Sequence, residues 1–136
     1  MFYVIPMEPR ILLVEDDPFL RSVTVEMLTD MGWSIAEAPD GTRALEILQS
    51  EAGRDIRLLV TDVMMPGMNG YELALNATSL RPDLKVLYVS GYAYDVLPQE
   101  VMEDGTAVLE KPYTARALDE RVRRILGVTQ PAYVTH

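Results

Sequence analysis

The feature that most constrains the fold is a regular alternation of apolar runs with segments whose apolar residues recur at helical spacing. The expected strands cover residues 11–14, 33–38, 58–61, 85–89 and 106–109. The expected helices begin near residues 19 and 41 and then cover about 69–81, 93–103 and 115–125. Such alternation is typical of a parallel sheet with helices on both faces. We therefore predict an α/β fold, a doubly wound (βα)5 unit with a five-stranded parallel sheet.

Helix ends are marked by residues with known capping chemistry. Asp17 is the expected N-cap of the first helix, and Asn69 with Glu72 three residues later forms a possible capping box for the third. Gly127 is expected to end the last helix. Pro98 lies inside the segment predicted as the fourth helix, so this helix is the least regular of the five.

Length and charge restrict the class of protein further. A chain of 136 residues fits one domain, which we place at 10–127, with an N-terminal arm at 1–9 and a C-terminal tail at 128–136. The net charge of −9 argues against nucleic-acid binding by the domain itself, because phosphate contacts need a basic surface. The chain has no cysteine and no apolar run long enough to cross a bilayer. These features fit a cytoplasmic protein without membrane contact of its own.

Polar residues follow four of the expected strands at the point where each strand ends. Glu15 and Asp16 follow the first strand, Asp62 the third, Ser90 the fourth and Lys111 the fifth. Ligands of open parallel sheets bind outside the carboxyl ends of the strands. These side chains can therefore converge although they are far apart in sequence. Three carboxylates, a hydroxyl and an ammonium group are the parts of a site that accepts a phosphoryl group.

The carboxylates of Glu15, Asp16 and Asp62 are expected to repel one another. At about 5 Å and an effective dielectric constant of about 20, each pair of like charges costs about 3 kcal/mol. Such a cluster takes up a proton or binds a cation. Oxygen ligands with room for waters favour Mg²⁺ over Ca²⁺, and Mn²⁺ can substitute.

Asp62 is the candidate nucleophile of this site. A metal-bound carboxylate can attack phosphorus and form an aspartyl phosphate. Such transfer depends on positioning and on neutralising the phosphoryl oxygens. Lys111 can supply a charge, Ser90 a hydrogen bond, and the backbone amides after Asp62 a small anion-binding nest.

From about Arg10 to Gly127 the chain resembles the receiver domains of bacterial two-component response regulators. The matching residues are the acidic pair Glu15 and Asp16, Asp62 in TDVMMPGMNG, Ser90 in VSGY and Lys111 in EKPY. The resemblance implies a flavodoxin-like fold with strand order 2-1-3-4-5. It covers both stand-alone receivers and the receivers of hybrid sensor histidine kinases, and the stretch RPDLKVLYVSGYAYD favours the hybrid form.

The resemblance also implies roles for these residues. Asp62 would be phosphorylated, with Ser90 and Lys111 as catalytic and switch residues. Asp16 would bind Mg²⁺ directly, Glu15 would assist directly or through water, and the backbone carbonyl of Met64 would join Asp62 as a ligand. The protein would catalyse its own phosphorylation and dephosphorylation without being a turnover enzyme.

Partners follow from the same resemblance. The donor would be a phosphohistidine on a histidine kinase or a histidine phosphotransfer protein. A downstream protein would bind the face formed by the fourth helix, the fifth strand and the fifth helix. The family often holds the bond before its conserved proline in cis, which implies a cis peptide between Lys111 and Pro112.

Two departures from the family pattern are informative. The switch position three residues before the lysine, commonly Tyr or Phe, is Val108. The candidates to replace the missing ring are Tyr88, Tyr92 and Tyr94. Met64 and Tyr92 occupy positions that flank the path of the water attacking the phosphoryl group. Both are bulky and neither is an acid or amide, so we expect a long-lived phosphoryl group.

The last helix and the tail contain the remaining candidates. The arginines expected on its solvated face, or alternatively on a partner-docking surface, are Arg116, Arg121, Arg123 and Arg124. His136 is the only histidine and lies in the tail. A phosphohistidine in this pathway therefore belongs to another protein or domain.

Three other classes of protein fit the sequence less well than a receiver domain. A pseudo-receiver would bind partners without phosphorylation, which the complete set of five site residues disfavours. A phosphohydrolase of the haloacid-dehalogenase type needs a second aspartate two residues after Asp62, where this chain has Met64. A flavin-binding protein would have a Ser- and Thr-rich loop after the first strand, where this chain has acids.

Overall fold

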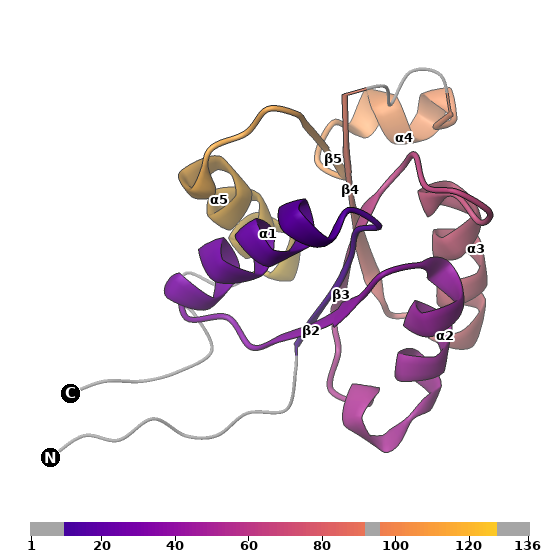
Figure 1. Cartoon of the computed structure of the whole chain (residues 1–136). Helices are drawn as coiled ribbons and strands as arrows, with labels where there is room; N and C mark the ends of the chain where they lie inside the picture. The colour runs from indigo at the N-terminus through magenta and orange to yellow at the C-terminus, as the bar shows by residue number, and fades with distance from the viewer. Residues whose placement is uncertain (1–9, 92–95, 128–136) are drawn as a thin grey trace, which may run out of the picture.

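The computed structural model describes residues 10–91 and 96–127, so the arm 1–9, the tail 128–136, Tyr92 and Tyr94 lie outside the described residues (Figure 1). The strands are β1 (Ile11–Val14), β2 (Ile35–Ala38), β3 (Leu58–Asp62), β4 (Lys85–Ser90) and β5 (Val108–Glu110). The helices are α1 (Pro18–Asp30), α2 (Gly41–Gln49), the 3-10 turn η1 (Glu51–Gly53), α3 (Gly70–Leu80), α4 (Gln99–Asp104) and α5 (Ala115–Leu126).

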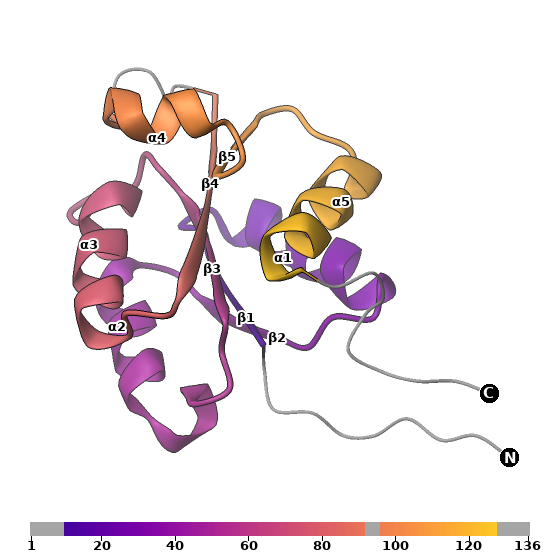
Figure 2. The same cartoon turned by 180° about the vertical axis from the view of Figure 1, so that it is seen from behind.

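The strands form one parallel sheet in the order β2-β1-β3-β4-β5, which confirms the predicted fold class and strand order. Helices α1 and α5 cover one face of the sheet, and α2 and α3 cover the other (Figures 1 and 2). Val14 of β1 is in register with Thr61 of β3, and Asp62 is in register with Val89 of β4. The carboxyl ends of these strands are therefore level with one another.

The core has two main layers because alternate strand residues point to opposite faces. On the α1–α5 side, Ile11, Leu13 and Val60 pack with residues such as Leu118 of α5. On the α2–α3 side, Leu12, Val14 and Leu59 pack with Leu48 and Leu73. The central strands β1 and β3 read as almost continuous apolar runs because both of their faces are buried.

The helix caps follow the sequence signals. The Asp17 side chain accepts hydrogen bonds from the backbone N–H groups of Phe19 and Leu20, so α1 begins directly after it. Asn69 and Glu72 form a complete capping box at the start of α3. Gly127 ends α5 with a φ of 71°, a conformation that glycine adopts without steric cost.

The prediction for the fourth helix was wrong at its start. Residues 96–98 are not helical, and α4 begins at Gln99 with Pro98 as its N-cap. A proline disfavours the helical conformation of the residue before it, which explains why the helix starts after Pro98 and not before. The expected strands 33–38 and 106–109 are also shorter or shifted, at Ile35–Ala38 and Val108–Glu110.

The expectation that all four arginines of α5 are solvated was wrong for two of them. Arg121 donates to the backbone carbonyls of Gly105, Thr106 and Val108. The Arg123 Nε lies 3.0 Å from the Asp119 Oδ2, inside the molecule. Helical periodicity places a side chain on a face, but an arginine can lie along that face and reach unpaired carbonyls.

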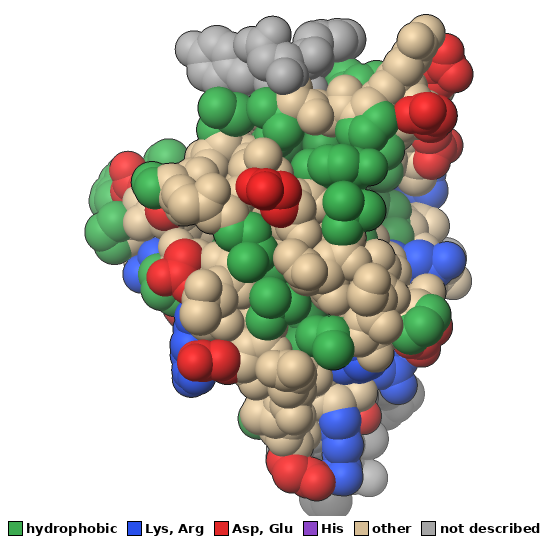
Figure 3. Space-filling model, turned by 90° about the vertical axis from the view of Figure 1, so that its right-hand side faces the viewer, with side chains coloured by type: hydrophobic (Ala, Val, Ile, Leu, Met, Phe, Trp, Pro, Cys, Tyr) green, Lys and Arg blue, Asp and Glu red, His purple; other side chains and the backbone are tan. Residues whose placement is uncertain are grey.

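The outer surface of α2 and α3 mixes hydrophobic and charged side chains (Figure 3). Leu75 and Leu80 of α3 are exposed large hydrophobic residues. No helix among residues 10–91 and 96–127 has the length and apolar character needed to cross a membrane.

We predict that Gly70→Ala destabilises the fold, because Gly70 lies where α3 meets the end of β3. A Cβ at this position would lie 2.2 Å from the Asp62 carbonyl oxygen and 2.9 Å from the Val63 Cα. Both are backbone atoms, so the expected loss in free energy of unfolding is about 2 kcal/mol. Gly91→Ala is the control, since its Cβ would meet nothing within 4 Å. Urea denaturation that gives equal stabilities for the two variants would contradict this prediction.

Candidate functional site

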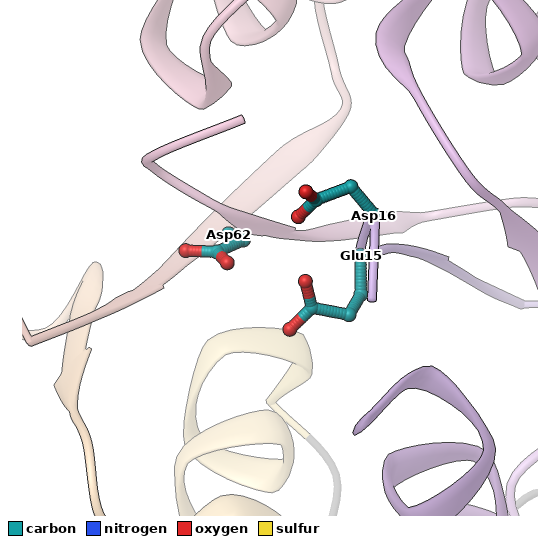
Figure 4. Close-up of side chains that lie close together, drawn as sticks. All are labelled: Glu15, Asp16 and Asp62. Atoms are coloured by element: carbon teal, nitrogen blue, oxygen red, sulfur yellow. The ribbon is translucent and has the colours of Figure 1, made fainter. Parts of the chain in front are cut away.

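The structure brings the three predicted carboxylates together at the carboxyl end of the sheet. Glu15 and Asp16 lie in the turn after β1, and Asp62 is the last residue of the neighbouring strand β3. One carboxylate oxygen from each residue lies within 4.8 Å of the other two. In Figure 4 the Glu15 and Asp16 side chains both extend toward the side on which Asp62 lies.

Burial differs among these acids. The Glu15 side chain is buried, Asp62 is half-buried and Asp16 is exposed. Burial raises the pKa of the Glu15 carboxyl; the Asp17 backbone N–H bonded to it at 3.3 Å acts in the opposite direction, and the negative charge of Asp62 raises the pKa further. Burial and the neighbouring Asp62 therefore both disfavour the charged form of Glu15.

Lys111 offsets part of this negative charge. Its Nζ lies 3.3 Å from the Asp62 Oδ2 and 3.4 Å from the Glu15 Oε1. Burial alone would lower the pKa of Lys111, but the charges of Asp62 and Glu15 raise it above the usual value, so the ammonium form is retained. The peptide bond between Lys111 and Pro112 is cis, as the resemblance implied.

Ser90 is the last residue of β4 and is only 2% exposed. It lines an open cavity of about 730 Å³ together with Asp62 and Lys111. The cavity continues between α1 and the β5–α5 loop, where Leu20 and Met27 make its wall apolar. The structure thus places the hydroxyl, the carboxylate and the ammonium group at one cavity.

The other predicted residues lie around this cavity or outside the described residues. Met64 is exposed at the cavity, and its N–H donates to the Asp62 Oδ1 over 3.4 Å, a long hydrogen bond. Tyr92, the second residue predicted to flank the water path, is outside the described residues. The Met64 carbonyl stays a predicted ligand.

Tyr88 is the described candidate to replace the missing switch aromatic. It is in register with Val108 on the adjacent strand, so the two side chains are neighbours. Its ring lies 6.4 Å from that of Tyr71, measured between centroids, in a cluster under α3 and α4. Burial and the neighbouring Tyr71 raise the pKa of Tyr88 to about 12, so the phenol stays protonated at neutral pH.

Two contacts near the site were not predicted from the sequence. The Thr24 and Tyr113 hydroxyls lie 3.2 Å apart and join α1 to the loop that follows Lys111. The Arg21 guanidinium donates to the Glu15 carbonyl over 2.8 Å. No local sequence motif predicts either contact, because each depends on how α1 packs against the sheet and the β5–α5 loop.

Comparison with known proteins defines the class to which this fold and site belong. Residues 11–123 match the family described as the response regulator receiver domain. The chain belongs to this family, whose members are signalling modules and not classical enzymes.

Particular relatives include both arrangements expected from the sequence. The response regulator receiver protein CpdR of Brucella abortus (strain 2308) is 38% identical over 118 residues, which are 86% of this chain and 96% of that protein. The sensor kinase CckA of the same strain is 36% identical over 117 residues, which are 85% of this chain and 12% of the kinase. The crystal structure of the receiver domain from the hybrid histidine kinase CckA has a TM-score of 0.71 at 37% identity, covering 86% of this chain and 98% of that one.

The donor set of Glu15, Asp16 and Asp62 fits a hard divalent cation. All three groups offer oxygen, and at least one is exposed, which leaves room for the waters that Mg²⁺ retains. A cation at this point would favour the charged form of Glu15, which burial and the charge of Asp62 disfavour.

We predict that Glu15→Gln stabilises the metal-free protein at pH 7 and weakens its response to Mg²⁺. The pKa of Glu15 is higher in the folded protein than its ordinary value of 4.5. Its contribution to stability is therefore fully present below pH 4.5 and is lost as the pH rises through the folded-state pKa. The variant should melt about 2–5 °C above the native protein at pH 7, and the difference should shrink toward pH 4.5. Saturating Mg²⁺ should raise the melting temperature of the native protein more than that of the variant.

Glu26→Gln is the matched control, because Glu26 is exposed on α1 and outside the cluster. Melting curves at several pH values, with and without Mg²⁺, provide the measurement. A variant at position 15 that behaves like the one at position 26 would contradict this account of the site.

Proposed function

We propose that this chain is the phosphoacceptor switch of a two-component phosphorelay, in which Asp62 receives a phosphoryl group from a phosphohistidine. The observation that carries the proposal is the position of the Asp62 carboxylate between two sources of positive charge. One is Lys111 at 3.3 Å, and the other is the oxygen cluster suited to Mg²⁺. A carboxylate in this position can attack phosphorus while the charge that develops on the phosphoryl oxygens is neutralised.

The transfer is a single displacement. An Asp62 carboxylate oxygen forms a bond to phosphorus, while the bond from phosphorus to the donor imidazole nitrogen breaks. The electron pair of the broken bond stays on that nitrogen. The imidazole takes up a proton from solvent and becomes the neutral side chain of histidine. Mg²⁺, or Mn²⁺ in its place, supplies charge neutralisation when bound by Glu15, Asp16, Asp62 and the Met64 carbonyl.

Three groups of this chain then hold the acyl phosphate. The Lys111 ammonium binds one phosphoryl oxygen, and the Ser90 hydroxyl donates to another. The Met64 N–H, which already points at the Asp62 carboxylate, is available to a third. Lys111 exchanges its present contacts with Asp62 and Glu15 for this new one.

The surroundings of the site support a protein donor. Leu20 and Met64 are exposed large hydrophobic residues that line the cavity at Asp62, and Phe19, next to Leu20 on α1, is exposed as well. An apolar rim around a charged centre suits a helical partner that presents a phosphohistidine. The donor is a histidine kinase or a histidine phosphotransfer protein, and the setting is the cytoplasm.

The output surface is α4, β5 and α5. Ser90 ends β4, and this strand pairs directly with β5, so movement of Ser90 toward a phosphoryl group displaces the edge of the sheet. A downstream protein reads that displacement. The domain, residues 10–127, acts without nucleic-acid or membrane contact of its own, and it catalyses its own phosphorylation and dephosphorylation.

Two other functions are possible for this fold, and one observation disfavours each of them. A pseudo-receiver would share this fold but would not accept phosphate, and the ion pair of Lys111 with Asp62 disfavours it. A phosphohydrolase would need an acid two residues after Asp62, and the exposed Met64 at that position can neither donate nor accept a proton.

The proposal predicts a mass gain of one phosphoryl group after incubation with Mg²⁺ and acetyl phosphate or phosphoramidate. Asp62→Asn should show no gain because the amide is not a nucleophile of this kind. Asp83→Asn, at an exposed position before β4, is the control and should be modified like the native protein. Intact-protein mass spectrometry measures the gain.

A folded native protein that gains nothing from either small donor or from a phosphohistidine protein would establish the pseudo-receiver. Turnover of small phosphate esters would instead establish the phosphohydrolase.

We further predict a slow loss of the phosphoryl group, because Met64 cannot orient the attacking water. Met64→Asn introduces an amide at this position and should speed hydrolysis about tenfold, which corresponds to about 1.4 kcal/mol of barrier. Leu75→Asn, on the exposed side of α3, should leave the rate unchanged. Following the phosphorylated mass over time gives the rates, and spontaneous loss from the native protein within minutes would refute the prediction.

A further inference from the structure

Arg21 lies on α1 directly behind the acidic turn, and its side chain is only 18% exposed. We propose that Arg21 is a positioning residue for the metal site: it holds the turn that carries Glu15 and Asp16 in the geometry that Mg²⁺ requires. This inference rests on the proposed function, since it assigns a role toward the same cation.

Arg21 contacts the Glu15 backbone carbonyl and the Glu37 carboxylate, and not the side-chain oxygens proposed to bind the metal. Its Nη1 donates to the Glu15 carbonyl over 2.8 Å. Its Nε donates to the Glu37 Oε1 over 3.1 Å, in an ion pair with a carboxylate at the surface of β2. The guanidinium therefore ties α1, β2 and the turn after β1 to one another.

The Glu15 carbonyl is the point where such a tie matters most. It belongs to the peptide group that joins Glu15 to Asp16, so its orientation sets the direction of both side chains. The Glu15 N–H is already fixed, because it donates to the Ala38 carbonyl over 3.2 Å. With Arg21 in place, the backbone of Glu15 is held from both sides.

The position of the Glu15 carbonyl explains why a side-chain partner is needed here. Backbone carbonyls that are partly buried need a partner, and the Glu15 carbonyl lies beyond the last residue of β1, where the ladder to β3 has ended. Loss of Arg21 would leave this carbonyl to find water, and the turn would be free to rotate. Metal affinity depends strongly on such supporting contacts, which typically contribute 10–100-fold.

A purely electrostatic role for Arg21 predicts the opposite effect. A cation behind three carboxylates repels Mg²⁺, so removing the charge alone would tighten binding. The positioning role predicts weaker binding. The sign of the change therefore separates the two explanations.

Lysine provides a second test of the geometry. Arg21→Lys keeps the charge, but a single ammonium group cannot reproduce the planar fork that reaches the Glu15 carbonyl and Glu37 together. Positioning predicts a loss of affinity smaller than that of Arg21→Gln, whereas a charge effect predicts no change for the lysine variant.

The experiment is isothermal titration calorimetry of the full chain with Mg²⁺. It is carried out at a low temperature at which circular dichroism shows that each variant is folded. The proteins are the native chain, Arg21→Gln, Arg21→Lys and the control Arg43→Gln, whose arginine is exposed on α2 and paired with Glu46. We expect Arg21→Gln to raise the Kd for Mg²⁺ about tenfold. Arg21→Lys should raise it by a smaller factor, and Arg43→Gln should leave it within about twofold.

Global stability does not substitute for this readout. A merely structural arginine would lower the melting temperature and leave the Kd of the folded protein unchanged, and that result would overturn the proposal. Equal or tighter Mg²⁺ binding by both Arg21 variants would overturn it as well. If the native chain itself bound no Mg²⁺, the proposed function would fall together with the inference, whereas native binding with unaffected variants would remove the inference alone.

Discussion

Mutual repulsion of three carboxylates at the carboxyl end of a parallel sheet is the constraint around which this molecule is arranged. Glu15, Asp16 and Asp62 are held there because β1 and β3 are adjacent and in register. The apolar layers on both faces keep these strands in place and so keep like charges close together. The energy of packing the sheet is thus partly used to hold a site that favours a cation, a proton or a new negative group bound with its counter-ion.

Lys111 links this constraint to the far edge of the sheet. It follows β5 in the chain, yet its ammonium group contacts acids from the β1 turn and from β3. The Thr24–Tyr113 hydrogen bond holds the following loop against α1, and the Arg121 contacts hold α5 against the start of β5. A change of charge at Asp62 therefore acts first on Lys111 and then on the element that carries it. These contacts connect Asp62 to β5 and α5, which belong to the proposed output surface.

Much of this arrangement could be predicted because local signals and global fold agree. Apolar runs predicted all five strands to within about two residues at each end, and Asp17, Asn69 and Gly127 marked helix ends correctly. The convergence of Asp16, Asp62, Ser90 and Lys111 followed from the general geometry of parallel sheets. What the sequence could not supply were contacts made by long side chains across elements. Arg21 and Arg121 reach backbone carbonyls through tertiary packing, and no spacing rule specifies which carbonyl a flexible arginine will find. The later start of α4 has a local cause, since Pro98 disfavours the helical conformation of the residue before it.

The single tryptophan has a consequence for the study of this protein. Trp33 is 3% exposed, and its indole N–H donates to the Asp119 carboxylate of α5 over 2.8 Å. Its packing partners are on the α1–α5 side of the sheet, which includes one helix of the proposed output surface. The chain therefore contains a single tryptophan, and the environment of its indole ring depends on the position of α5. Its spectrum can report the motion of an output helix without any attached label.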